Sequence, residues 1–337
     1  MKNDNNYSEL VSSFFRKHLA GTKDASVNTI FAYRDAFIVF NDYLVRHAGF
    51  KLEKMGVTDL SRGLILDYLS YLDTERGYSA SSRNHRLAAL KSFARYVQVE
   101  APEAMNVCQA ILAIESKNAA KPIINYLNTR QTDLLMEQPD LSRWKGRRDL
   151  ALLLLMYDSA ARAQEICNLK VDEVRLTPPA LIRVLGKGRK SRDIPISAPC
   201  AKVLQQYIQE NHLDRPECAK RTLFVNPQGT KLTRSGISYV LSKYVKCANN
   251  KEPNALPDIT PHCLRHSKAM HLVEAQTNLI YIRDFLGHES VETTQVYAKA
   301  NPEARRKAIE AASNQINTPG LSDWNDDPDI TAFLKSL

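Results

Sequence analysis

The chain has 337 residues, 44% of them hydrophobic, a length that exceeds one ordinary core and predicts two domains. Lys and Arg total 46 against 37 Asp and Glu, and the resulting net charge of +9 favours a polyanionic partner, with nucleic acid ranked before an anionic membrane. Neither a run of about 18 apolar residues nor a signal-peptide pattern occurs, so we expect a cytoplasmic protein without a membrane partner.

Apolar residues recur at helical spacing through the first third of the chain. They predict helices at 7–20, 26–47, 62–76 and 79–98 and a shorter one at 103–115. Ser26 is a plausible N-cap for the second helix. The segment 115–128 is polar, contains Pro122 and lacks this period, which predicts a linker between domains.

The fourth of these helices also carries a group of basic residues. The solvated surface of a helix explains them when the segment is taken alone, whereas the positive net charge favours contact with a DNA backbone. The candidate DNA-binding residues are Arg83, Arg86, Lys91 and Arg95.

The second part of the chain begins with helices and then changes pattern. Two short, β-branched segments flank a Gly-rich turn at 186–191 and predict a β-hairpin, with strands at 180–185 and 192–196. Further helices are expected at 129–138, 146–158, 199–211, 233–247, 261–275, 277–286 and 291–312. The expected fold is mainly α in two domains, a helical bundle followed by an α+β domain with a small antiparallel sheet.

The stretch TPHCLRHSKAM, residues 260–270, predicts a site for an anion. Thr260 suits a helix N-cap and Pro261 the first helical position, so His262 and Arg265 lie on one face near a helix N-terminus. The rival interpretation is a metal site, because His262 and His266 are four apart. The metalloprotease pattern requires Glu at the position of Cys263, and the six cysteines are scattered, so we expect no metal and free thiols.

Two other segments offer basic groups. Arg162 and Glu165 are one turn apart, and they are either a structural ion pair or a carboxylate that orients an arginine towards a phosphate. Lys187 lies at the predicted hairpin tip, where it is either simply solvated or able to donate a proton to a bound phosphodiester.

A tyrosine completes the set. Gly287 is suited to end one helix and Ser290 to cap the next, which holds His288 in the turn between them. Tyr297 follows on the new helix and by itself is more typical of a core residue. A tyrosine near two arginines can instead attack a phosphodiester, with the arginines stabilising the charge that develops on the phosphate. The sequence has neither a P-loop nor a convincing acidic trio for two metals.

These motifs resemble the tyrosine recombinase (phage integrase) family, in particular its compact Xer-like and transposon-encoded members. Arginine, lysine, histidine, arginine, histidine and tyrosine occur in the expected order. The segments that match, over about 129–312, are ARAQEICNL, GKGRKSRDIPI, HCLRHS, LGHES and TTQVYAKA. The helical segment before them is similar to the family's SAM-like core-binding domain.

The resemblance implies strand cleavage through a 3′-phosphotyrosine, without metal, ATP or other cofactor. By the same resemblance Tyr297 is the nucleophile, and Arg162 and Arg265 bind the scissile phosphate. Lys187 is then the general acid, His262 and His288 assist proton transfer, and Glu165 supports Arg162.

The resemblance also implies an organisation and an assembly. We expect a core-binding domain at 1–116, a linker at 117–128, a catalytic domain at 129–312 and a C-terminal tail at 313–337. No extra domain is seen ahead of the helical segment, so the expected target is double-stranded DNA with paired core sites. An apolar stripe of residues in 328–337 predicts a short helix, which we expect to dock on a neighbouring protomer of a homo-tetramer on DNA.

Two other functions remain open at the level of sequence. One is a nicking-closing enzyme similar to a type IB topoisomerase, which shares the tyrosine chemistry but performs no strand exchange. The other is a non-catalytic relative that binds specific DNA sites. The sequence does not distinguish integration, excision or dimer resolution, nor does it name the mobile element or the DNA site.

Overall fold

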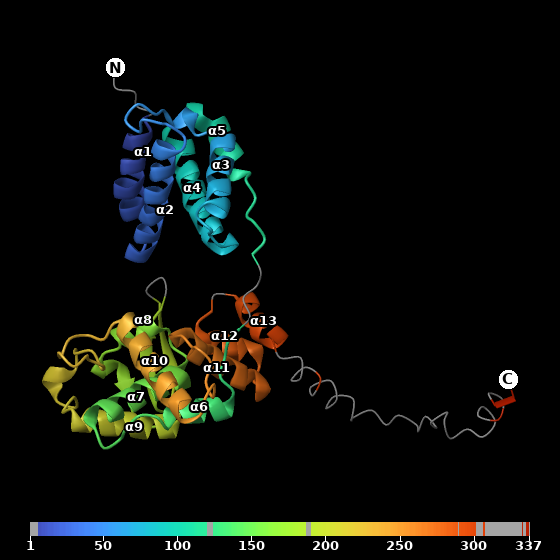
Figure 1. Cartoon of the computed structure of the whole chain (residues 1–337). Coiled ribbons are helices and arrows are strands. Elements are labelled where there is room, and N and C mark those ends of the chain that lie inside the picture. Colours follow the sequence, from blue (N-terminus) through green and yellow to red (C-terminus); the bar gives the residue numbers. More distant parts are fainter. Residues whose placement is uncertain are drawn as a thin grey trace. The chain divides into compact units, whose positions relative to one another are not determined.

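The computed structural model describes residues 6–119, 124–186, 190–288 and 290–300, together with 306, 332, 335 and 336. The chain divides into two compact units, Met1–Pro122 and Ile123–Leu337 (Figure 1). Within the described residues, no helix is long and apolar enough to cross a membrane. Most of the predicted terminal helix in 328–337 lies outside the described residues, which include only 332, 335 and 336 of it. The tip residue Lys187 also lies outside them.

The described residues of the first unit form helices and no β-strand, as predicted. It contains α1 (Tyr7–Ser13), the π-helix η1 (Phe14–Thr22), α2 (Val27–Arg46), α3 (Arg62–Thr74), α4 (Ala80–Glu100) and α5 (Met105–Leu112), with short 3₁₀ turns at Val57–Asp59 and Pro102–Ala104. The α-helix expected over 7–20 continues as a π-helix from Phe14. Phe14 and Leu19, five residues apart, are both fully buried there, a spacing that suits the i→i+5 turn.

Serine caps fix where three helices of this unit begin. The Ser26 hydroxyl accepts a hydrogen bond from the backbone N–H of Thr29, and Ser61 and Ser79 cap α3 and α4 in the same way. Each bond satisfies one of the free N–H groups of a first turn, which is why the predicted helix starts are confirmed to within about a residue.

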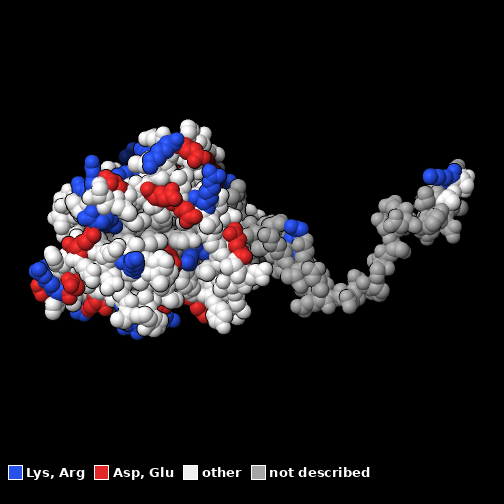
Figure 2. Space-filling model, turned by 90° about the horizontal axis from the view of Figure 1, so that it is seen from below, with Lys and Arg blue, Asp and Glu red and all other residues white. Residues whose placement is uncertain are grey.

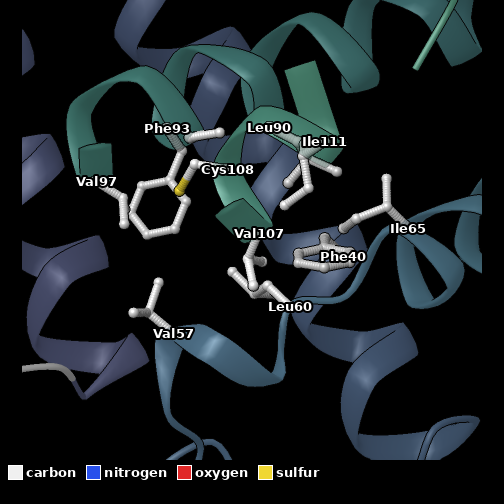
Figure 3. Close-up of a pocket in the computed structure, with 11 residues that line it drawn as sticks. Phe40, Val57, Leu60, Ile65, Leu90, Phe93, Val97, Val107, Cys108 and Ile111 are labelled. Carbon is white, nitrogen blue, oxygen red and sulfur yellow. The ribbon is translucent and has the colours of Figure 1, made fainter. Parts of the chain in front are cut away.

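Aromatic and aliphatic side chains form the core of the first unit. The ring of Phe14 meets that of Phe93 edge-on, with centroids 5.4 Å apart. Figure 3 shows a small pocket in this core between α2, α4 and α5. Its lining is apolar throughout and offers no charged group to orient a ligand, so the pocket is a gap in the packing. The lining residues are Phe40, Val57, Leu60, Ile65, Leu90, Phe93, Ala94, Val97, Val107, Cys108 and Ile111.

The second unit combines helices with a small sheet. The helices are α6 (Thr129–Met136), α7 (Trp144–Ser159), α8 (Ala163–Asn168), α9 (Ala198–Glu210), α10 (Arg234–Lys251), α11 (Pro261–Glu274), α12 (Leu279–Leu286) and α13 (Val291–Ala300). The predicted hairpin is present as β2 (Leu181–Leu185) and β3 (Ser191–Pro195), antiparallel and with Arg183 opposite Asp193. A third strand that the sequence did not indicate, β1 (Val174–Arg175), pairs with β2.

α7 lies at the centre of this unit, where it contacts α9 and α11. Its leucines Leu152, Leu153 and Leu155 are fully buried and point in different directions around the helix. The Lys268 ammonium on α11 donates to Asp158 on α7 at 3.0 Å, and both side chains are largely buried. α11 is therefore fixed to the central helix, and α12 and α13 pack against α11 (Figure 1).

Charged side chains of both signs lie on the surface of the molecule. Figure 2 shows one face, seen from below, on which Lys and Arg are interspersed with Asp and Glu. The net charge of +9 is not gathered into a continuous basic patch on this face.

Candidate active site

Glu165 joins two arginines at the start of α8. Its Oε1 accepts from Arg162 Nη1 at 3.0 Å and from Arg192 Nη1 at 3.0 Å, and its Oε2 accepts from Arg192 Nη2 at 2.9 Å and from the Arg162 backbone N–H at 2.8 Å. Burial raises the pKa of Glu165, but the hydrogen bonds from Arg192 and Arg162 outweigh it and lower the pKa overall. The carboxylate is therefore ionised at neutral pH and holds both guanidinium groups in place.

Arg162 retains access to solvent while it is held in this way. Its side chain is 36% exposed, and its Nη2 also donates to the Gly287 carbonyl at 3.4 Å. Ala160, just before it, ends α7 in the left-handed region with φ of 48° and turns the chain into α8. The two interpretations of Arg162 and Glu165 are thus compatible, because the ion pair exists and leaves part of the guanidinium free to meet an anion.

Arg265 is buried at only 3% exposure, and backbone carbonyls position it. Its Nη1 donates to the Ala160 carbonyl at 2.7 Å and its Nη2 to the Leu286 carbonyl at 2.7 Å. Both carbonyls lie at the C-terminal ends of helices, where the helix dipole favours a cation. Burial lowers the pKa of Arg265 to about 10, with Arg162 contributing, so the guanidinium remains charged at neutral pH.

The histidines of the site are neutral at pH 7. Burial, followed by the charges of Arg265 and Arg162, lowers the pKa of His262, and burial with the same arginines lowers that of His288 to about 4. His288 follows Gly287, which ends α12 with φ of 65°, and its Nδ1 lies 3.0 Å from Thr294 Oγ1. The positive charge of the site comes from its arginines.

Tyr297 lies on α13 and is 3% exposed. Its ring is stacked with that of His288, with centroids 6.3 Å apart and an interplanar angle of 10°. Burial raises the pKa of Tyr297 while Arg265 lowers it, so the phenol is protonated at neutral pH. The residue packs in an apolar cluster with Ala160, Ala269, Met270, Ile282 and Leu286. Both descriptions made from the sequence apply, since Tyr297 is a core residue and also lies among the predicted polar groups.

The structure brings most of the predicted residues into one site. They come from the start of α8, from α11, from the turn after α12 and from α13, and they are Arg162, Glu165, His262, Arg265, His288 and Tyr297. Lys187 lies outside the described residues. Within those residues, no group of three or more His, Cys, Asp or Glu side chains is placed to hold a metal, and all six cysteines are free.

Two residues of the site were not singled out for it from the sequence. Arg192 lies two residues before buried Ile194 on β3, so strand periodicity places both on the inner face, although nothing local indicates Glu165 as the partner of Arg192. His266 was considered only as a metal ligand. It shares a helix face with His262, four residues away, and its Nδ1 lies 2.8 Å from the Tyr297 hydroxyl.

The four basic residues predicted to bind DNA differ in their surroundings on α4. Arg83 pairs with Asp73 at 3.3 Å, and the Arg86 guanidinium lies 4.2 Å from the ring centroid of Tyr78. Arg95 is exposed and Lys91 half-buried, one turn apart. Two of the four are thus engaged within their own unit, and the other two are available to a partner.

Comparisons with known families identify the family of the chain. The family model described as Phage integrase family matches residues 125–304, and that described as Phage integrase, N-terminal SAM-like domain matches residues 13–100. The first match spans more than half of the chain. The chain therefore belongs to the phage integrase family.

The names of two similar proteins indicate which activity the chain has. A putative integrase/recombinase, y4rC, of Sinorhizobium fredii is 35% identical over 97% of this chain and 97% of its own length. The tyrosine recombinase XerC of Roseiflexus castenholzii is 34% identical over 88% of this chain and 90% of its own. This chain is accordingly a tyrosine site-specific recombinase.

Solved structures share the fold. The Tn1549 transposon integrase in complex with transposon right end DNA has a TM-score of 0.69 and 16% identity, covering 94% of this chain and 100% of that chain. The XerH site-specific recombinase bound to palindromic difH substrate has a TM-score of 0.65 and 20% identity, covering 93% of this chain and 89% of that one. The mainly helical, two-domain fold predicted from the sequence is confirmed.

Proposed function

We propose that Tyr297 is the nucleophile of this recombinase and that Arg162 and Arg265 bind the scissile phosphate. The observation that carries this assignment is the convergence of a tyrosine, two charged arginines and neutral histidines, from α8, α11, α13 and the turn before it. The charge of Arg265 acts to lower the pKa of Tyr297, and the charge of Arg162 acts to lower the pKa of Arg265. A phosphate bound by these guanidinium groups would have the negative charge of its transition state stabilised.

The remaining residues have supporting roles. Glu165 holds Arg162, and His262 and His288 hold the phosphate and assist proton transfer. Lys187 is the general acid that protonates the leaving 5′-oxygen, a role that its position in the sequence between β2 and β3 supports. The chemistry conserves bond energy, because the phosphotyrosine replaces one phosphodiester oxygen by another, and so it needs no added cofactor.

The two units have different roles in the reaction. Residues 1–116 form a core-binding domain that contacts duplex DNA through Arg83, Arg86, Lys91 and Arg95 on α4. Residues 117–128 link it to the catalytic domain, 129–312. The enzyme acts in the cytoplasm, where its DNA partner lies.

The active assembly is a homo-tetramer on two paired core sites, with residues 313–337 of each protomer docked on a neighbour. The XerH neighbour is bound to a palindromic substrate, which supports binding to paired half-sites. An apolar place for the tail is available on the second unit, where Ile280 and Tyr281 of α12 and Val296 of α13 are 50%, 70% and 45% exposed.

A nicked duplex that traps the covalent intermediate tests the nucleophile. The parent should form a denaturant-stable protein–DNA adduct, and Tyr297→Phe should form none while binding the duplex as tightly. The Phe variant loses one hydrogen bond, worth about 1 kcal/mol of stability, so it should still fold. An adduct with Tyr297→Phe would contradict the assignment. Exchange of strands between two duplexes separates a recombinase from a nicking-closing enzyme.

A further inference from the structure

His266 lies directly against the proposed nucleophile. Its Nδ1 is 2.8 Å from the Tyr297 hydroxyl, and the two ring centroids are 5.6 Å apart. His266 follows Arg265 on α11, and the buried position of Arg265 fixes which way the helix faces. Neither the polar set that defines the site nor the family comparison assigns this histidine a role.

Both partners of this hydrogen bond are neutral at neutral pH. Burial, followed by the charges of His262 and Arg265, lowers the pKa of His266 to about 4, while burial raises that of Tyr297. With its own proton on Nε2, the neutral imidazole can accept the phenol proton at Nδ1. The charged and titratable groups that face the pair are His262 and Arg265 of α11 and His288 of the turn before α13.

We propose that His266 is a further catalytic residue, the base that takes the Tyr297 proton as the phenol attacks the phosphate. The proposal rests on Tyr297 being the nucleophile. As the new bond between the phenolic oxygen and phosphorus forms, the O–H bond breaks and its proton passes to Nδ1. The bond from phosphorus to the 5′-oxygen breaks with its electron pair, and that oxygen receives a proton from the general acid. Rejoining runs the same transfers backwards.

The geometry meets the first requirement of general-base catalysis. A base must lie within about 2.6–3.2 Å of the atom whose proton it removes, and the observed distance falls inside this range. His266 is a weak base in the free enzyme and becomes a stronger base when DNA binds. A phosphate placed between Arg162 and Arg265 brings negative charge to the site, and negative charge nearby raises the pKa of a histidine. The phenol also becomes more acidic as its oxygen bonds to phosphorus, so the proton moves as the bond forms.

The alternative is that His266 only holds Tyr297 in place. His266→Asn distinguishes the two roles, because the Asn side chain can still hydrogen-bond near the position of Nδ1 but cannot take a proton. His266→Gln is the second variant if the first does not fold. Each is paired with a nucleophile that needs no base: 3,5-difluorotyrosine at position 297, whose ring fluorines acidify the phenol so that it is largely ionised at mildly alkaline pH.

The experiment measures the single-turnover rate of adduct formation by the full-length enzyme on the nicked duplex. With tyrosine at 297, His266→Asn should slow this rate by about 10²- to 10⁴-fold, the usual contribution of a general base, without loss of DNA affinity. With difluorotyrosine, most of that loss should disappear. Arg162→Ala is the matched control, since it removes phosphate binding and should be slow with both nucleophiles.

Three results would overturn the proposal. His266→Asn reacting at the parent rate would show that the proton goes elsewhere. An equal loss with tyrosine and difluorotyrosine would make His266 a positioning residue. A parent enzyme that forms no adduct at all would remove Tyr297 as nucleophile, and that result is distinguishable from the other two because it does not depend on residue 266.

Discussion

Gly287 lies directly against the guanidinium of Arg192. A Cβ atom built on Gly287 would be 2.8 Å from both Cζ and Nε of Arg192, closer than such atoms approach in proteins. Gly287 also has φ of 65°, in the left-handed region that favours glycine. One glycine thus ends α12, leads the chain into His288 and leaves room for the arginine that shares Glu165 with Arg162.

Gly287→Ala should therefore impair catalysis as well as stability. The left-handed backbone costs about 1–2 kcal/mol with a Cβ present, and the methyl group must displace Arg192 from Glu165. We expect adduct formation on a nicked duplex to slow by roughly tenfold or more, since about 1.4 kcal/mol of lost transition-state stabilisation is a factor of ten.

Gly77→Ala provides the matched control for this change. Gly77 has φ of 61°, and a Cβ there would meet nothing within 4 Å. Both variants should melt at a lower temperature than the parent, and only Gly287→Ala should also be slow in cleavage. Equal activity of the two variants, measured at a temperature at which both are folded, would show that Arg192 does not contribute to catalysis.

Arg192 itself should position Arg162 through Glu165. Arg192→Ala leaves a carboxylate that is only 6% exposed with one guanidinium instead of two. Loss of one partner of a buried charge costs on the order of 3 kcal/mol, so both the melting temperature and the adduct rate should fall. Arg192→Lys should restore the charge but not the two parallel hydrogen bonds, and so should recover only part of the rate.

Arg183→Ala is the comparison for Arg192. Arg183 lies on the neighbouring strand β2 and pairs with Asp193, with both side chains exposed to solvent. Exposed ion pairs contribute little to stability, so this variant should melt and react like the parent. If Arg192→Ala reacts at the parent rate, Glu165 holds Arg162 without its help.

The buried histidines predict a stability that rises with pH. His266 and His288 have pKa values of about 4 in the folded protein, and an unfolded histidine titrates near 6.5. Between these values the unfolded chain binds more protons, so acid favours unfolding. The melting temperature should be highest above pH 6.5 and fall as the pH is lowered from 6.5 towards 4.

His288→Gln should make the melting temperature depend less on pH, because it removes one of the two buried histidines. His85→Gln, a change at an exposed histidine of α4, should leave it as in the parent. A parent melting temperature that stays constant between pH 4 and 6.5 would mean that these histidines are not neutralised by burial.

Features that depend on nearby residues could be predicted from the sequence. Ser26 and Ser79 cap helices because a side-chain oxygen meets an N–H group two or three residues later, and the strand pattern around residues 186–191 specifies a hairpin. The two-residue strand β1 was missed because so short a segment shows no alternation.

Features that depend on distant contacts could not be predicted in the same way. The bonds from Glu165 to Arg192 and from His266 to Tyr297 join residues 27 and 31 positions apart. Periodicity gives the face on which a side chain lies but not what it meets there. Burial likewise decides that His262 is neutral, and burial is a property of the packed domain.

The last prediction concerns which residues of α4 contribute to DNA binding. Arg95 is exposed and Lys91 half-buried, and within the described part of the chain neither forms an ion pair, so both can meet a phosphate. Each phosphate contact that is lost should reduce the slope of log affinity against log salt by about 0.9. Lys91→Ala with Arg95→Ala should therefore bind DNA more weakly and reduce that slope by up to about two, with an unchanged melting temperature.

Arg83→Ala and Arg86→Ala should behave differently, because these side chains have partners inside the unit. Arg83 pairs with Asp73, and Arg86 stacks on Tyr78 and donates to its hydroxyl at 3.2 Å. Their loss should lower the melting temperature along with the affinity. Fluorescence anisotropy of a labelled duplex over a series of salt concentrations, together with thermal melts, measures both quantities. A salt slope that is unchanged in the Lys91 and Arg95 double variant would show that this face of α4 does not contact the DNA backbone.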